Sequence, residues 1–214
     1  MTIEEPEDAQ SERDPAQLGL RQVSDARTMR ALAHPVRIAL IEQLSMGGAM
    51  TATEVGELIG ESPTTCSFHL RQLAKYGFVE EAGGGKGRAR PWRMTSVGMQ
   101  VSDTHDSPEA QIAANALIQL IRERAMRRYQ TWLETKATYP RRWQEAAMEN
   151  EYVAYLTIEE LEQLNDELMA MLVPRFRGRL TDPSLRPPGS VPVEMLMISY
   201  PIGPPPPGTS DGAR

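Results

Sequence analysis

The stretch that decides the fold is residues 51–77, which read TATEVGELIGESPTTCSFHLRQLAKYG. Thr51 and Glu54 have the spacing of a capping box, in which each side chain accepts a hydrogen bond from the backbone of the other. A short helix is therefore predicted to begin here and to end at Gly60. The side chains predicted to point inward from this helix are Val55, Leu58 and Ile59.

A second helix is predicted from Ser62 to Tyr76 and is ended by Gly77. Ser62 is a favourable N-cap, and Pro63 is well tolerated as the first helical residue. At about 100° per residue, three side chains share one apolar face. They are Cys66, Leu70 and Leu73. Two helices joined by a short glycine-containing turn are the signature of a helix-turn-helix motif.

The opposite face of the second helix carries hydrogen-bonding side chains and one aromatic ring. Arginine can bond both acceptors of guanine, glutamine can pair with adenine, and a threonine methyl or a phenyl edge can contact the thymine methyl. The residues predicted to contact bases are Thr64, Thr65, Phe68, Arg71 and Gln72. The alternative is an ordinary solvated helix face, although an exposed phenylalanine beside these polar groups is unusual there. His69, at the flank of the apolar face, is predicted to be packed and hydrogen-bonded.

Residues 78–82 and 91–96 are predicted to form a hairpin around a glycine-rich basic tip. A nucleotide-binding P-loop is excluded, because no Gly-Lys pair is followed by serine or threonine and the next segment is not helical. A flexible basic tip fits a wing that follows a DNA groove. The residues predicted to hold phosphates are Ser62, Ser67, Lys75, Lys86, Arg88 and Arg90. A solvated basic loop is the alternative.

Further helices are predicted on both sides of this unit, over residues 25–33 with Ser24 as N-cap, over 35–47, and over 108–138. The residues predicted to face inward from the second of these are Val36, Leu40, Ile41 and Leu44. The long helix carries an apolar stripe formed by Ala113, Leu117, Leu120, Ile121, Ala125, Tyr129, Trp132 and Leu133. This stripe exceeds what one small domain can cover. A symmetric dimer through the 108–138 and 24–33 helices is therefore predicted.

Beyond the long helix the pattern predicts strands over 152–156 and 191–200, a helix over 157–173 and a loop over 181–190. The residues predicted to face inward from the helix are Leu161, Leu164, Leu168, Met171 and Leu172. The predicted fold class is mainly α with a small β component. It comprises a disordered acidic N-terminus (1–20), a winged helix-turn-helix domain (21–100), a dimerisation and candidate effector region with a small α+β part (108–200), and a disordered Pro/Gly-rich tail (203–214).

The charge of the chain is unevenly distributed. The formal net charge is −6, but residues 1–20 contribute −5, residues 21–100 contribute +3 and residues 101–214 contribute −4. A DNA-binding protein needs a cationic face against the phosphates. The central third of the chain is the only one that can supply it.

Residue content narrows the function classes further. Cys66 is the only cysteine, which excludes an internal disulfide framework and a multi-cysteine metal site. With three histidines, His34, His69 and His105, no Cys-His or Ser-His-Asp catalytic set is recognisable. No catalytic residue, cofactor or metal is therefore predicted. The N-terminus lacks an apolar leader and no run approaches a membrane span, so a soluble, cytoplasmic protein is expected.

These motifs together resemble the ArsR-type winged-helix repressors, over residues 24–100. The segments that carry the resemblance are 32–41 (LAHPVRIALI), 53–58, 62–73, 77–79 and 87–88. The resemblance implies a homodimer that binds operator DNA and regulates transcription in bacteria, with helices outside the reading motif forming the dimer seam.

The sequence departs from the metal-sensing members of that family. Those members carry paired cysteines in the first helix of the reading motif, where this chain has none. A second sensing pattern begins with Asp103 and His105, but Ala116 stands where its second histidine would be. Metal sensing is not expected. The aromatic residues after residue 128 could line a pocket for a small organic effector, or could instead form the core and dimer seam of an added domain. They are Tyr129, Trp132, Tyr139, Trp143, Tyr152 and Tyr155.

The sequence therefore predicts a homodimeric repressor that binds double-stranded operator DNA with a recognition helix in the major groove and a basic wing. One rival is a winged helix used to dock another protein, which would bind no duplex DNA. The other is a small enzyme built on the C-terminal part, for which no catalytic set is visible.

Overall fold

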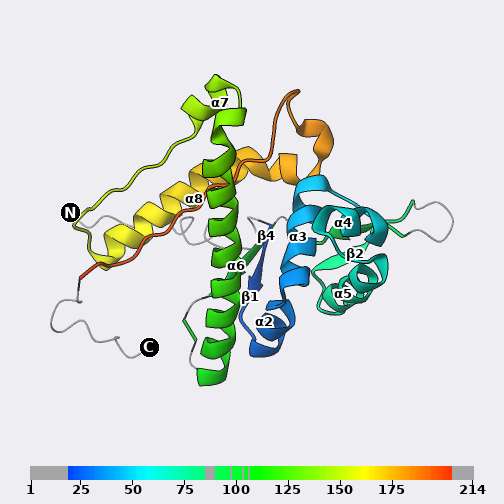
Figure 1. Cartoon of the computed structure of the whole chain (residues 1–214). Helices are drawn as coiled ribbons and strands as arrows, with labels where there is room; N and C mark the ends of the chain where they lie inside the picture. Colours follow the sequence, from blue (N-terminus) through cyan, green and yellow to red (C-terminus); the bar gives the residue numbers. More distant parts are fainter. Residues whose placement is uncertain (1–18, 85–89, 97, 103, 106, 204–214) are drawn as a thin grey trace.

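The computed structural model describes residues 19–84, 90–96, 98–102, 104–105 and 107–203 (Figure 1). The predicted disorder of residues 1–20 and 203–214 falls almost entirely outside this part. The elements in chain order are β1 (Leu20–Val23), α2 (Ala26–Leu32), α3 (Pro35–Gly47), α4 (Ala52–Ile59), α5 (Pro63–Lys75), β2 (Val79–Glu81), β3 (Trp92–Met94), β4 (Gly98–Val101), α6 (Pro108–Thr135), η1 (Lys136–Thr138), α7 (Arg141–Ala146), α8 (Ile158–Thr181) and η2 (Pro183–Leu185). The fold is mainly helical with little strand, as predicted. In Figure 1 the long α6 stands between α2–α5 on one side and most of α8 on the other.

The first helices begin at polar caps. The N-cap of α2 is Asp25, not the predicted Ser24, because the Asp25 carboxylate accepts a hydrogen bond from the backbone N–H of Thr28 at 2.8 Å. The predicted start of α3 at Pro35 is confirmed, and its N-cap is His34, whose Nδ1 accepts from the backbone N–H of Val36 at 3.2 Å. Both caps satisfy backbone donors that have no partner within the helix.

The hydrophobic core lies where α2, α3, α4, α5 and the first half of α6 meet. Its large, fully buried side chains include Met29, Leu32, Leu40, Leu44, Val55, Leu70, Leu73, Phe78 and Leu117. Most of the residues predicted to point inward from α3, α4 and α5 are buried or half-buried. Leu58 is the exception, since its side chain is 59% exposed on α4.

The first half of the α6 stripe is covered within one chain. Ala110, Ala113, Ala114 and Leu117 are buried, and α6 packs against α2. Small side chains let two helices approach closely, so these alanines seat α2 on α6. The two helices predicted to form a seam between copies therefore bury part of that stripe against each other.

Two pairs of short strands complete the first half of the chain. β2 and β3 pair antiparallel, with Val79 opposite Met94, which confirms the predicted hairpin. Met50, just before α4, extends this hairpin through reciprocal backbone hydrogen bonds with Trp92 of 2.9 and 2.7 Å. The sequence did not predict the second pair, in which β1 runs parallel to β4. The pairing joins residues almost 80 positions apart, so no local pattern announces it.

The C-terminal region is helical and extended. The helix predicted over 157–173 is present but continues to residue 181 as α8, with Pro174 inside it. The strands predicted over 152–156 and 191–200 are wrong, since neither segment is in a strand and their apolar side chains are largely exposed. The prediction failed because β-branched and aromatic residues favour a strand only where a neighbouring strand supplies hydrogen-bond partners.

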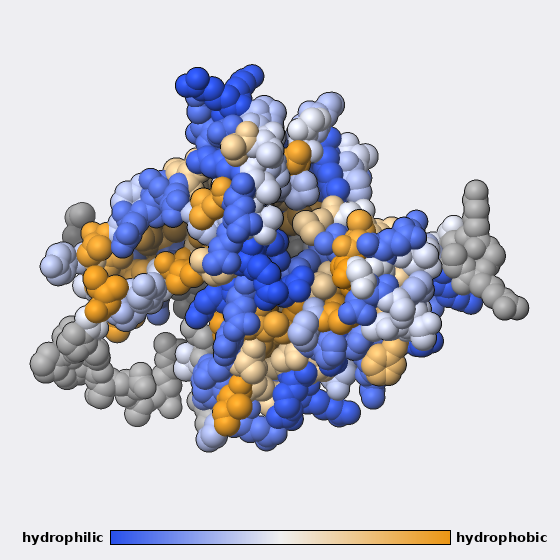
Figure 2. Space-filling model, viewed as in Figure 1, coloured by the Kyte–Doolittle hydropathy of each residue, from blue (hydrophilic) through white to orange (hydrophobic). Residues whose placement is uncertain are grey.

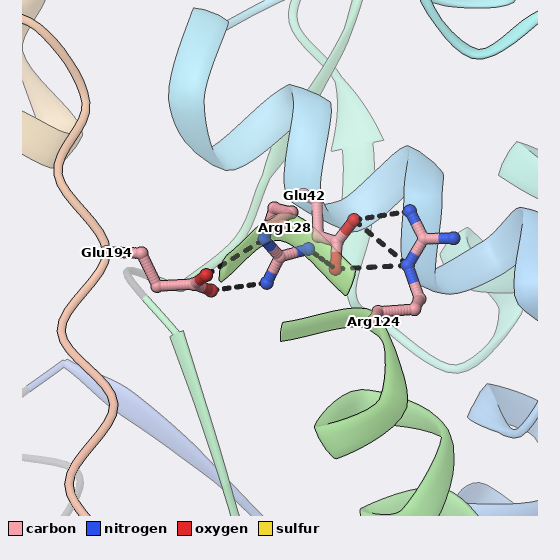
Figure 3. A network of polar contacts seen from close by, with 4 residues as sticks. All are labelled: Glu42, Arg124, Arg128 and Glu194. Carbon is pink, nitrogen blue, oxygen red and sulfur yellow. Dashed lines mark hydrogen bonds and ion pairs between the residues drawn. The ribbon is translucent and has the colours of Figure 1, made fainter. Parts of the chain in front are cut away.

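A network of ion pairs ties three distant parts of the chain together (Figure 3). Glu42 of α3 accepts hydrogen bonds from Arg124 and Arg128 of α6, each at a shortest distance of 2.6 Å. Arg128 also bonds the carboxylate of Glu194 in the C-terminal segment, with its Nε at 3.0 Å and its Nη2 closer still. The network joins the N-terminal core, the long helix and the C-terminal segment.

Candidate nucleic-acid interface

The helices α4 and α5 are joined by the tight turn that the sequence predicts. The capping box is confirmed, with Thr51 N to Glu54 Oε2 at 2.7 Å and Glu54 N to Thr51 Oγ1 at 3.3 Å. Gly60 ends α4 at a φ of +73°, which few side chains tolerate, and so turns the chain toward α5. Ser62 caps α5 by accepting from the backbone N–H of Thr65 at 3.0 Å.

Gly56 permits the close packing of the two helices, a role that the sequence analysis missed. A Cβ at this position would lie 2.7 Å from the backbone oxygen of Glu61 and 3.4 Å from the sulfur of Cys66. Any larger residue would therefore push α4 away from the turn and from α5. A glycine in the middle of an otherwise helical pattern was the available signal.

The two faces of α5 match the prediction from helical periodicity. Cys66, Leu70 and Leu73 are fully buried. The opposite side is open to solvent, and its exposed members are Ser62, Thr64, Phe68, Arg71 and Lys75. The remaining predicted contact residues of α5 are half-buried at the flanks: Thr65, Ser67 and Gln72. An apolar ring half-exposed among polar groups fits an unfilled contact surface.

A groove of about 380 Å³ lies between α5, the start of α4 and the hairpin. It is lined by Thr51, Ala52, Thr53, Pro63, Ser67, Arg71, Glu81, Arg90 and Trp92. Ser67, Arg71 and Arg90, which the sequence placed in the interface, thus share one concave surface. The α4 residues, Glu81 and Trp92 were not predicted, because only the fold brings them beside α5.

The two arginines in the described part of the hairpin are engaged in exposed ion pairs. Arg90 Nη1 lies 3.0 Å from Glu81 Oε2, and Arg93 Nη2 lies 2.8 Å from Glu80 Oε1. Exposed pairs of this kind contribute little stability, so they can exchange one carboxylate for another anion at small cost. Lys86 and Arg88, at the predicted tip, lie outside the described residues.

Residues 32–82 match a family model for helix-turn-helix domains. In its fold this part of the chain has the two helices and tight turn of a helix-turn-helix domain, to which it is similar. The match covers α3, α4, α5 and β2, and a domain of this kind is typical of DNA-binding regulators. The matched family model is broader than the ArsR-type repressors, so the match does not support the ArsR resemblance specifically. No curated protein matched the chain.

The rings of two histidines pack against each other at a tilt of 40° inside the helix-turn-helix domain. The rings of His34 and His69 are 4.4 Å apart between centroids, and His69 is buried beside Phe68. The predicted packing of His69 is confirmed, but its Nδ1 makes no hydrogen bond to any described residue. Burial, reinforced by the neighbouring His34 and Arg37, lowers the pKa of His69, so its ring is neutral near pH 7.

Cys66 packs as a small apolar residue, as predicted. Its side chain is buried, and burial raises the pKa of the thiol, which keeps it in the unreactive protonated form. Among the described residues, no group of three or more His, Cys, Asp or Glu side chains is arranged to hold a metal ion. Within the same ranges, no helix is both long and apolar enough to cross a membrane.

The C-terminal aromatic residues do not gather around one cavity. Trp132 and Tyr139 pack edge to face with ring centroids 4.8 Å apart. Tyr152 and Tyr155 are almost wholly exposed, so they line no pocket in this chain. The predicted alternatives of an effector pocket or an added core therefore do not apply to these two tyrosines within one chain.

The cap of α5 gives a first test of the domain. Ser62→Ala is expected to lower the free energy of unfolding by about 1 kcal/mol, because the backbone N–H of Thr65 loses its acceptor. Ser62→Gly should lower the free energy of unfolding by only about a few tenths of a kcal/mol, because glycine leaves the backbone N–H groups at the helix start accessible to water. Urea denaturation of both variants measures the difference. A Ser62→Ala variant as stable as the wild type would show that the hydroxyl does not cap the helix.

Proposed function

We propose that the chain is a transcription regulator that binds operator DNA as a homodimer and represses transcription. In this proposal α5 enters the major groove and the β2–β3 hairpin serves as a wing against the backbone. The observation that carries the proposal is the groove between α5 and the hairpin, with Arg71 and Arg90 on its walls. DNA binding also accords with the match of residues 32–82 to helix-turn-helix domains.

Each predicted contact residue has a proposed role. The exposed face of α5 is assigned to bases, through Thr64, Thr65, Phe68, Arg71 and Gln72. The phosphate contacts are assigned to Ser62, Ser67, Lys75, Lys86, Arg88 and Arg90. Arg90 would leave Glu81 to reach a phosphate. Because basic side chains that neutralise phosphates release counterions from the DNA, the affinity for DNA should fall as the salt concentration rises.

The rest of the chain is assigned to assembly and control. Residues 21–100 form the proposed DNA-binding domain, and residues 108–200 the proposed dimerisation and effector region. A small organic effector would release DNA by favouring the dimer form that binds DNA less tightly. The bonds from Arg128 to Glu42 and Glu194 offer a physical link between the proposed DNA-binding domain and the proposed effector region. The proposed location is the cytoplasm.

Arg71→Ala tests the DNA-reading role. We expect the binding free energy to weaken by about 1–3 kcal/mol on a duplex that the wild-type protein selects from a random library. The preference of the protein for one base pair of that duplex should also relax. The reason is that the exposed guanidinium of Arg71 sits on the reading face of α5. Fluorescence anisotropy with selected and random duplexes measures both effects.

The charge-matched control is Arg127→Ala, an exposed arginine on α6 away from the groove. It should leave the affinity for both duplexes nearly unchanged. Equal weakening by Arg71→Ala on selected and random duplexes would remove Arg71 from base reading. A wild-type protein that binds no duplex at all would favour the protein-docking alternative.

A further inference from the structure

The largest apolar surface among the described residues lies in the C-terminal third. Eighteen of the twenty-six large hydrophobic side chains that are exposed follow residue 147. Figure 2 shows apolar side chains gathered over α8 and the extended segment 191–202 beside it. Over residues 158–180, whose burial the structure describes, no side chain of α8 is buried, although the helix has 24 residues. A helix in water draws most of its stability from packing one apolar face, so a partner for this face is to be expected.

The spacing of the α8 apolar residues is that of a helix-pairing seam. Leu161, Leu164, Leu168 and Met171 follow one another at intervals of three, four and three residues, which places them along one stripe. Leu164 is 43% exposed and Met171 is 50% exposed. The stripe is therefore incompletely covered within one chain.

The charges of α8 are separated along its length. All five acidic residues lie in its first ten positions: Glu159, Glu160, Glu162, Asp166 and Glu167. Its three basic residues lie near its end: Arg175, Arg177 and Arg179. Two copies of this helix packed antiparallel would place the acidic half of each opposite the basic half of the other. A parallel pair would place like charges together.

The segment 191–202 adds a second, mostly apolar component to the surface. It is extended along α8, where Ser199 Oγ bonds Asn165 Oδ1 at 3.2 Å. In the described part of the chain its residues make no backbone–backbone hydrogen bond. Its one charged side chain, Glu194, is already paired with Arg128. A second copy of this segment would therefore meet no unpaired like charge.

We propose that this surface is the dimer seam, with α8 antiparallel to α8 of a second copy across a two-fold axis. A symmetric interface must be complementary to itself, and the charge pattern of α8 is complementary to its own reverse. The inference rests on the dimer in the proposed function but places the seam away from α2 and α6. Glu194 then links the seam to Arg128 and, through Glu42, to the helix-turn-helix domain.

Leu164→Glu tests the seam in the full-length protein. Sedimentation velocity without DNA at about 10 µM should show a wild-type dimer, and the substitution should weaken dimerisation on the order of 100-fold, because it places a charge in the seam twice per dimer. Ile112→Glu is the comparison, since Ile112 is exposed on α6 outside the proposed surface. It should leave the dimer intact.

Charge exchange gives a test that does not depend on apolar packing. Glu167→Arg and Arg175→Glu should each weaken the dimer, because both residues lie four positions from Met171 beside the apolar stripe. The double variant should restore the dimer, because each reversed charge then meets a reversed partner. A monomeric wild type, single reversals without effect, or a double variant that stays dissociated would each overturn the proposal. A dimer broken by Ile112→Glu but not by Leu164→Glu would also overturn it, in favour of α6. The DNA-reading role is tested separately by the Arg71 variant.

Discussion

Leu70→Ala is expected to lower the free energy of unfolding by about 3 kcal/mol, whereas Leu58→Ala should lower it by less than about 1 kcal/mol. Leu70 is fully buried in the middle of α5, on the face of that helix that packs into the core. Its truncation removes apolar contacts and leaves a cavity that close-packed neighbours cannot fill. Leu58 lies on α4 with most of its side chain already in water, so its truncation removes little burial.

The two leucine variants form a matched pair, since the chemical change is identical and both sites lie in the helix-turn-helix domain. Urea denaturation followed by circular dichroism gives both losses on one scale. Leu70→Ala should also reduce the amount of folded, DNA-binding protein at 37 °C, while Leu58→Ala should not. Equal losses of stability would contradict the exposure of Leu58 and would restore the orientation that the sequence predicted.

Glu42→Gln is expected to lower the free energy of unfolding by about 2–3 kcal/mol. The Glu42 side chain is only 19% exposed and accepts hydrogen bonds from two arginines, so a neutral amide leaves both guanidinium groups without their carboxylate. The matched control is Glu145→Gln on α7. That carboxylate pairs with Arg141 in an exposed i,i+4 arrangement, whose loss should cost less than about 0.5 kcal/mol.

The contribution of Glu42 to stability should depend on pH in a definite direction. Burial acts to raise the pKa of Glu42, but the hydrogen bonds from Arg124 and Arg128 outweigh it and lower the pKa below its ordinary value. A carboxyl whose pKa is lowered on folding contributes stability above its unfolded pKa, about 4.3, and loses that contribution as pH falls through the folded pKa. Denaturation of wild type and Glu42→Gln between pH 7 and 3 should therefore converge at the acid end. If the stability of the two proteins changed with pH in parallel, the ion pairs of Glu42 with Arg124 and Arg128 would not stabilise the fold.

Local patterns were enough to predict the helix-turn-helix unit of this protein. Thr51, Ser62 and Pro63 set helix starts through bonds within three residues of each cap, and Gly60 ended α4 through its own backbone. The buried and exposed faces of α5 followed from a fixed rotation per residue, which placed Leu70 inside and Arg71 outside. These features need no knowledge of distant residues, so they could be predicted before any contact between elements was known.

The make-up of the groove depended on tertiary contacts. Trp92 and Glu81 face α5 because the hairpin folds back beside it, and the ion pair of Glu81 with Arg90 follows from strand pairing. Periodicity assigns a side chain to a face of its own helix but does not say which neighbour will cover that face. For the same reason the pattern placed Leu58 inward, although the described residues leave most of its side chain exposed.

The sequence by itself determined the caps of α4 and α5, the tight turn, the hairpin and the polar face of α5, because each is decided by residues a few positions apart. Only the tertiary structure decided the pairing of β1 with β4, the joining of Glu42 to Arg128, and the absence of strands over 152–156 and 191–200. A strand needs a partner for its backbone and a buried charge needs an opposite charge. Both requirements are met by residues far away in the chain, so the fold decides them.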